Sequence, residues 1–286
     1  MLIIIGFIIV TLSVILGFIW EGGQLLVLFQ PAEFLIIGGC MIGSIIVSLP
    51  IKTLKLMLSQ MKDALGSPPG KETYTNLLVM LYEIFQIARK DGLVALEGHI
   101  EKPEESNIVS KYPEFLENHH LVDFFSDTMR LIQSGVVPAH DLEALIDADL
   151  EVHHQETGRP SIALAKVGDS LPGLGIVAAV LGVVITMGAI GGPPEVIGHK
   201  VGAALVGTFL GILLCYGFVG PLATNMESMN EDKQQAYRIV KQALLGFHKG
   251  MAPSIAVELG RRSISSSARP GFIELEEACR ASRERG

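Results

Sequence analysis

Four stretches of the chain are apolar along their whole length and carry no acidic or basic side chain. They cover residues 1–20, 34–51, 170–194 and 201–226. About 18 consecutive apolar residues suffice to cross a bilayer as a helix, and a helix satisfies its backbone N–H and C=O groups within its own segment. The pattern therefore predicts an all-α, polytopic membrane protein with four transmembrane helices.

Outside these stretches, apolar residues recur at the three- and four-residue spacing of amphipathic helices. This spacing predicts helices at about 74–88, 121–132, 138–153 and 230–249. The first two end at breaks that contain glycine, Asp91-Gly92 and Ser134-Gly135. No alternating pattern of useful length predicts a strand, so the polar parts of the chain are expected to be helical as well.

The chain thus divides into transmembrane helices 1 and 2, a helical domain, transmembrane helices 3 and 4, and a helical tail. These segments are expected at residues 1–51, 52–169, 170–226 and 227–286. The domain and the tail hold 21 of the 22 Lys and Arg residues. Because basic residues concentrate on the cytoplasmic side, both termini, the domain and the tail are expected in the cytoplasm.

Composition excludes several classes of protein. Charged residues make up 18% of the chain, against about 25% in soluble domains. The first apolar stretch has no basic n-region and no small-x-small cleavage site, so it is interpreted as a retained span. The three cysteines show neither a disulfide framework nor a metal-binding spacing.

Motifs of soluble enzymes are missing from the sequence. It contains no phosphate loop, GxSxG or HExxH. The pairs His119-His120 and His153-His154 are adjacent in sequence rather than one helical turn apart, and are interpreted as surface residues. We therefore expect no enzymatic activity, cofactor, metal or nucleic-acid partner.

Small residues form one face of the third and fourth apolar stretches. On the third they follow each other at steps of three and four: Pro172, Gly175, Ala179, Gly182 and Thr186. On the fourth they recur every four residues, with Thr208 beside them: Ala203, Gly207, Gly211 and Cys215. Such faces let helices pack closely within one chain, or leave room for a partner helix or water. Both interpretations stay open at this point.

No Asp, Glu, Lys, Arg or His lies in the four stretches. Proton transport across a membrane needs titratable groups at depth. If the protein conducts ions, it must then surround a carboxylate that another protein supplies. Hydroxyls of Thr186, Thr208 and Tyr216 can face such a path, or can bond to their own helix backbone. Pro172 and Pro221 flank this pair of spans and suit either a plain kink or a hinge.

Two long segments resemble the MotA family of flagellar motor stator proteins. They are VGDSLPGLGIVAAVLGVV at 167–184 and VGAALVGTFLGILLCYGFVGPLA at 201–223. The likeness extends to QPAEFLIIGG at 30–39 and RPGFIELEE at 269–277, and it keeps its order along nearly the whole chain.

This resemblance implies a ring of five copies in the inner membrane around two copies of the single-span protein MotB. MotB would supply the aspartate that binds and releases the proton, and the ring would push on the rotor protein FliG. Four glycines of the small faces would then pack against partner helices: Gly175, Gly182, Gly207 and Gly211. Residues lining the ion path would be Ala179, Thr186, Thr208 and Tyr216.

The resemblance also carries over single positions. Arg89 and Glu97 fall where the family places charges that meet FliG, and Asp149 falls at a third acidic position. Exposed charges are more often an ordinary solvated surface. Pro172 and Pro221 match two prolines that the family links to coupling between ion flow and movement.

Ala179 is a departure from the sodium-driven members of the family, which resemble this segment but carry Thr at that position. Without this oxygen ligand, the resemblance favours protons as the driving ion. Two alternatives remain: an energiser of outer-membrane transport like ExbB or TolQ, which usually has three spans, and a passive membrane scaffold without ion flux.

Overall fold

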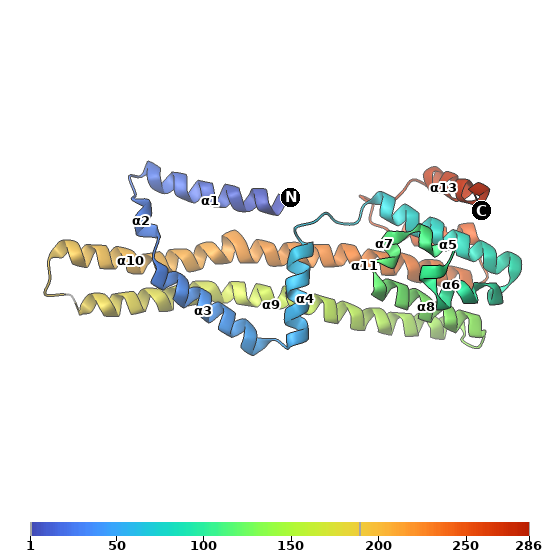
Figure 1. Cartoon of the computed structure of the whole chain (residues 1–286), viewed down its shortest axis with the longest axis horizontal. Helices are drawn as coiled ribbons and strands as arrows, with labels where there is room; N and C mark the ends of the chain where they lie inside the picture. Colours follow the sequence, from blue (N-terminus) through green and yellow to red (C-terminus); the bar gives the residue numbers. More distant parts are fainter. Residues whose placement is uncertain (1, 189, 286) are drawn as a thin grey trace. The chain divides into compact units, whose positions relative to one another are not determined.

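The computed structural model describes residues 2–188 and 190–285, and within these ranges the chain is helical and holds no strand (Figure 1). The longer helices are α1 (Leu2–Trp20), α3 (Pro31–Ser48), α4 (Ile51–Asp63), α5 (Lys71–Asp91), α8 (His119–Ser134), α9 (Ala139–Met187), α10 (Pro194–Leu213), α11 (Gly220–His248), α12 (Pro253–Arg262) and α13 (Phe272–Arg285). The shorter ones are α2 (Leu25–Leu28), α6 (Glu97–Glu101) and α7 (Pro113–Leu116). Three turns of 3₁₀-helix are η1 (Leu93–Leu96), η2 (Pro103–Glu105) and η3 (Val109–Lys111), and one π-helical segment is η4 (Leu214–Val219).

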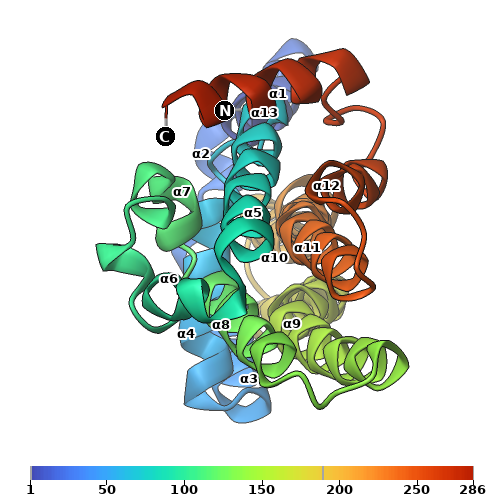
Figure 2. The ribbon, with the colours of Figure 1, turned by 90° about the vertical axis from the view of Figure 1, so that its right-hand side faces the viewer.

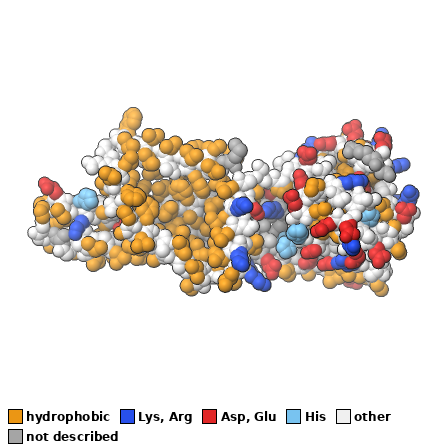
Figure 3. Space-filling model, in the orientation of Figure 1, with side chains coloured by type: hydrophobic (Ala, Val, Ile, Leu, Met, Phe, Trp, Pro, Cys, Tyr) orange, Lys and Arg blue, Asp and Glu red, His pale blue; other side chains and the backbone are white. Residues whose placement is uncertain are grey.

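The chain forms two compact units. The first, here called the membrane unit, consists of Met1–Ser67 and Thr157–Asn230, and the second, the polar unit, of Pro68–Glu156 and Glu231–Gly286. On the face drawn in Figure 3, hydrophobic side chains cover most of the membrane unit, whereas acidic and basic side chains are frequent on the polar unit.

Within the described ranges, four helical segments are long and apolar enough to cross a membrane. They are Leu2–Trp20, Leu25–Ser48, Ala139–Met187 and Pro194–His248. The expected number of spans is confirmed. Large apolar side chains such as Leu16, Val47 and Val184 point outward from them and would meet lipid.

Two helix boundaries expected from the sequence are wrong. The helix expected at 138–153 and the third span are one helix, α9, which continues through Pro160 and Pro172. The tail helix expected from about 230 already begins at Gly220, in α11. The change from apolar to charged side chains decides whether lipid or water surrounds the helix, but it does not interrupt the backbone hydrogen bonds.

Pro221 follows the π-helical segment η4 and lies in the first turn of α11. Proline has no N–H, and its ring collides with the carbonyl four residues earlier in an ordinary α-helix. The wider π-helical turn moves the preceding carbonyl groups away from the proline ring, so that the helix continues past Pro221. The backbone is crowded here, because a Cβ on Gly220 would lie 2.9 Å from the carbonyl oxygen of Cys215.

The polar unit is built around α5, whose Tyr74, Leu78 and Phe85 are fully buried. Figure 2 shows α5 among the other helices of this unit, α12 and α13 included. Phe85 stacks on Phe247 of α11 with ring centroids 4.5 Å apart. The tail therefore shares one apolar core with the segment around α5.

Both helix ends expected at glycines are confirmed in the polar unit. Gly92, directly after α5, has φ +86°, and Gly135, directly after α8, has φ +68°. Residues with a Cβ rarely adopt these backbone angles, which is why glycine stops both helices. At its start, α8 is capped by Asn118, whose Oδ1 accepts a hydrogen bond from the N–H of Leu121.

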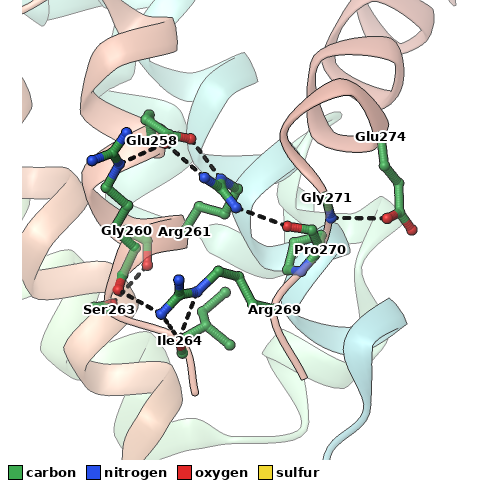
Figure 4. Close-up of polar contacts among 10 residues, drawn as sticks. Glu258, Gly260, Arg261, Ser263, Ile264, Arg269, Pro270, Gly271 and Glu274 are labelled. Carbon is green, nitrogen blue, oxygen red and sulfur yellow. Dashed lines mark hydrogen bonds and ion pairs between the residues drawn. The ribbon is translucent and has the colours of Figure 1, made fainter. Parts of the chain in front are cut away.

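Arginines fix the loop between α12 and α13 (Figure 4). Arg261 forms two hydrogen bonds to the Glu258 carboxylate, at 2.6 and 2.8 Å, and donates a third to the carbonyl of Pro270. Arg269 donates two hydrogen bonds to the carbonyl of Ile264, at 2.9 and 2.7 Å. The hydrogen bonds from Arg261, and after them the one from Arg262, hold the pKa of the Glu258 carboxyl below its usual value, although burial acts in the opposite direction.

Candidate functional site

Helices α9 and α10 come into backbone contact where their small faces meet. A Cβ built on Gly211 of α10 would lie 2.5 Å from the carbonyl oxygen of Leu171 and 2.9 Å from the Cα of Gly175, both on α9. A Cβ on Gly175 would lie 2.6 Å from the carbonyl oxygen of Gly207. No real Cβ tolerates such distances to backbone, so the two glycines are what allows this approach.

A second contact between the same helices lies further along. A Cβ on Gly182 would lie 2.7 Å from the Cβ of Ala204. Within one chain, the small faces therefore serve tight packing, the first of the two interpretations left open above. That Gly175, Gly182, Gly207 and Gly211 also pack against partner helices stays a prediction.

Gly207 faces a third helix as well. A Cβ built on it would lie 2.5 Å from Oε2 of Glu33, which belongs to the first turn of α3. Only 7% of Glu33 is exposed, and its Oε2 has no hydrogen-bond partner among the residues that the structure describes. Sequence reasoning missed this residue.

The expectation that no ionisable side chain lies within a span is therefore wrong. The run without charged residues begins at residue 34, directly after Glu33, whereas α3 begins at Pro31. A proline and an acidic residue near a helix N-terminus are typical start signals, and the segment QPAE carries both. These signals, rather than the absence of charge, mark where the helix begins.

The residues expected to line an ion path differ in their surroundings. Thr186 is buried, and its Oγ1 donates a hydrogen bond of 2.8 Å to the carbonyl of Gly182 in its own helix. Ala179 and Thr208 are half-buried, and Tyr216 is exposed. Their role in an ion path stays a prediction.

The two prolines lie in different settings. Pro172 is half-buried inside α9, and Pro221 is exposed at the start of α11. Neither ends its helix, in agreement with the tolerance of membrane helices for proline. Their part in coupling ion flow to movement is also a prediction.

The three charged residues expected to contact a rotor are exposed on the polar unit. Arg89 lies in the last turn of α5, and Glu97 is the first residue of α6, with Gly92 and η1 between them. Asp149 lies on α9. The helix end at Gly92 and the 3₁₀ segment η1 thus separate two exposed residues of opposite charge.

One histidine of the expected surface pairs is not a surface residue. His119, His120 and His154 are exposed, but His153 is half-buried, with its ring centroid 4.6 Å from that of Tyr237. Burial, and next the neighbouring His120, lower the pKa of His153, while Asp149 acts in the opposite direction. Burial is also the main cause that raises the pKa of Tyr237 to about 12.

Comparisons with known proteins agree along almost the whole chain. Residues 4–92 match the family model described as Motility protein A N-terminal, and residues 117–239 match the MotA/TolQ/ExbB proton channel family. The chain is 44% identical to Motility protein A of Escherichia coli (strain K12) over 98% of its own length and 96% of that protein. The chain belongs to the Motility protein A family.

Two further similarities extend this assignment. Chemotaxis protein LafT of Vibrio parahaemolyticus is 37% identical over 96% of each protein. The structure of C. jejuni MotAB matches with a TM-score of 0.76 at 20% identity, over 94% of this chain and 98% of that chain. The flagellar MotAB stator complex from Bacillus subtilis matches with a TM-score of 0.69 at 23% identity, over 89% and 92%. The all-α fold with four spans is confirmed.

Membership of the Motility protein A family answers the functional question at a coarse level. The chain is a multi-pass inner-membrane subunit of the flagellar motor stator, of the proton-channel kind, and not an enzyme. The near-complete match to Motility protein A decides against the alternative of an energiser like ExbB or TolQ.

Proposed function

We propose that five copies of this chain surround two copies of MotB, and that protons crossing this complex drive torque on FliG. The observation that carries the proposal is the match to Motility protein A over 98% of the chain. Solved stator complexes of the same fold, described as MotAB, support MotB as the partner. Both termini of the chain would lie in the cytoplasm, where the polar unit meets the rotor.

In this mechanism MotB brings an aspartate to the small faces of α9 and α10. Proton binding neutralises that carboxylate and changes which contacts it prefers with the surrounding ring. The ring then steps, and Arg89, Glu97 and Asp149 pass the movement to charges on FliG. Exposed ion pairs are individually weak, roughly 0–1 kcal/mol, which suits contacts that form and break at every step.

The experiment that tests the proposal is charge reversal on the polar unit in cells that lack their own Motility protein A. Arg89→Glu and Glu97→Lys should reduce swimming while the complex with MotB still assembles and conducts protons. Glu104→Lys is the matched control, because Glu104 is equally exposed on the same unit but matches no expected rotor contact.

Co-purification and proton leak of the complex measure assembly and conduction separately from swimming. Normal swimming in both reversals would contradict the role in torque. Absence of proton flux through the unmodified complex would contradict the proposal as a whole and favour a passive scaffold.

A further inference from the structure

The side chain of Glu33 fills a slot that two glycines create. Its Oε2 lies where a Cβ of Gly207 on α10 would be only 2.5 Å away, and its Oε1 would be 3.7 Å from a Cβ of Gly182 on α9. The carboxyl group therefore lies against two different helices at positions where both lack a side chain. Ala178 lies beside Gly207 and Ala204 beside Gly182, and both alanines are buried.

This slot offers no charge to a carboxylate. Residues 174–187 of α9 and 201–211 of α10 carry no acidic or basic side chain, and neither does the rest of α3 or α2. The nearest such groups along α10 are His199 and Lys200, about 10 Å or more along the helix axis from Gly207. A group that is buried without a counter-charge is far less costly in its neutral form.

We propose that Glu33 is a proton-binding site of this chain itself, which is protonated in its slot and ionised when water reaches it. The proposal rests on the proposed function, because it adds an acid from every ring subunit to the aspartate of MotB. The proton would come from water outside the membrane, bind the Glu33 carboxylate, and leave to the ionised carboxylate of MotB. Glu33 would then carry its charge again until the next proton arrives.

The position along the chain agrees with a role at the outer side. Glu33 follows α2 and belongs to the first turn of α3. The link that precedes α3 has no basic residue, which the positive-inside rule places outside the cytoplasm. A proton that enters from outside would thus meet Glu33 before it reaches deeper parts of the bundle.

The test uses the purified complex with MotB in liposomes and two readouts. The first is infrared difference spectroscopy, in which a protonated carboxyl gives a C=O band distinct from that of a carboxylate. We expect one acid band to disappear in Glu33→Gln and to shift in Glu33→Asp. Glu21→Gln is the matched control, because Glu21 is an exposed acid that precedes α2 and should leave this band unchanged.

The second readout is proton flux as a function of external pH. Glu33→Gln should lose most of the flux and its pH dependence, whereas Glu33→Asp should retain part of both. Gly207→Ala should reduce flux with Glu33 still present, since the new methyl group displaces the carboxyl from its slot. Gly202→Ala, on the same helix with open space around it, should behave like the unmodified complex.

Each outcome separates the two proposals. If Glu33→Gln keeps both the acid band and the flux profile of the unmodified complex, the Glu33 site is refuted while the stator function stands. If the unmodified complex conducts no protons, the stator function fails, and the acid band still decides whether Glu33 binds a proton. If Glu33→Gln assembles poorly, Glu33→Asp decides instead: a shifted acid band supports the Glu33 site, and an unshifted band refutes it.

Discussion

Replacing Gly211 by alanine should push α9 and α10 apart where their backbones touch. The new Cβ would lie 2.5 Å from the carbonyl oxygen of Leu171, whereas ordinary contacts begin at 3.4 Å. The helices must therefore separate by about 0.9 Å, and a gap of 0.5–1 Å forfeits roughly a quarter to a half of the dispersion attraction between the atoms concerned. Overpacking of this kind costs about 1–3 kcal/mol.

Thermal unfolding of the detergent-solubilised complex with MotB measures this cost. Gly211→Ala should unfold at a lower temperature than the unmodified complex, and Gly175→Ala should behave alike, since its Cβ would lie 2.6 Å from the carbonyl oxygen of Gly207. The double variant should cost less than the sum of the two, because one separation relieves both collisions.

Gly202→Ala is the control for helix propensity. Nothing lies within 4 Å of a Cβ at this position, and alanine favours helix over glycine by up to about 1 kcal/mol. It should unfold at the same temperature as the unmodified complex or higher. If Gly211→Ala is as stable as Gly202→Ala, the close approach of α9 and α10 does not depend on the missing side chain, and the reasoning is refuted.

Two further predictions concern titratable groups of the polar unit. Burial, and next the Glu83 carboxylate, raise the pKa of the Cys279 thiol to about 12, so at pH 8 only about one thiol in 10⁴ is a thiolate. Peptide mass spectrometry after maleimide treatment should therefore find Cys279 unlabelled until the protein is unfolded. Rapid labelling of the folded protein would contradict its burial. The pKa of His153 is lowered in the folded protein, so as the pH falls the unfolded chain, whose histidine pKa is about 6.5, binds a proton before the folded one does. The free energy of unfolding should therefore fall as the pH drops below about 6.5, and it should fall less steeply in His153→Gln. An exposed control, His119→Gln, should keep the slope of the unmodified protein.

The parts of the fold that the sequence could predict are those that depend on local patterns. Runs of apolar residues indicated four spans, and the glycines at 92 and 135 marked two helix ends, because a positive φ is a local demand on one residue. The continuity of α9 through Pro160 and Pro172 was not predictable in this way. The side chains along α9 change from charged to apolar, which indicates a change of surroundings from water to lipid. The backbone stays helical across this change.

The candidate site was predictable to a different degree. The spacing of small residues indicated a close helix pair, and Gly175 and Gly211 do lie at its tightest point. Glu33 was missed because a single acid beside an apolar run reads as the end of that run. Only the three-dimensional contact with Gly207 shows that it is buried, since the two residues are far apart in sequence.

The slot around Glu33 has a consequence for the order in which the protein is made. The ribosome produces α3 long before α9 and α10, so the carboxyl group of Glu33 enters the membrane region when neither wall of its slot exists. Until Gly207 has been synthesised and inserted, this acid lacks the slot that encloses it, and contact with water at the membrane surface is the less costly setting for its ionised form. The burial of Glu33 therefore follows the insertion of α9 and α10, which the ribosome reaches long after α3.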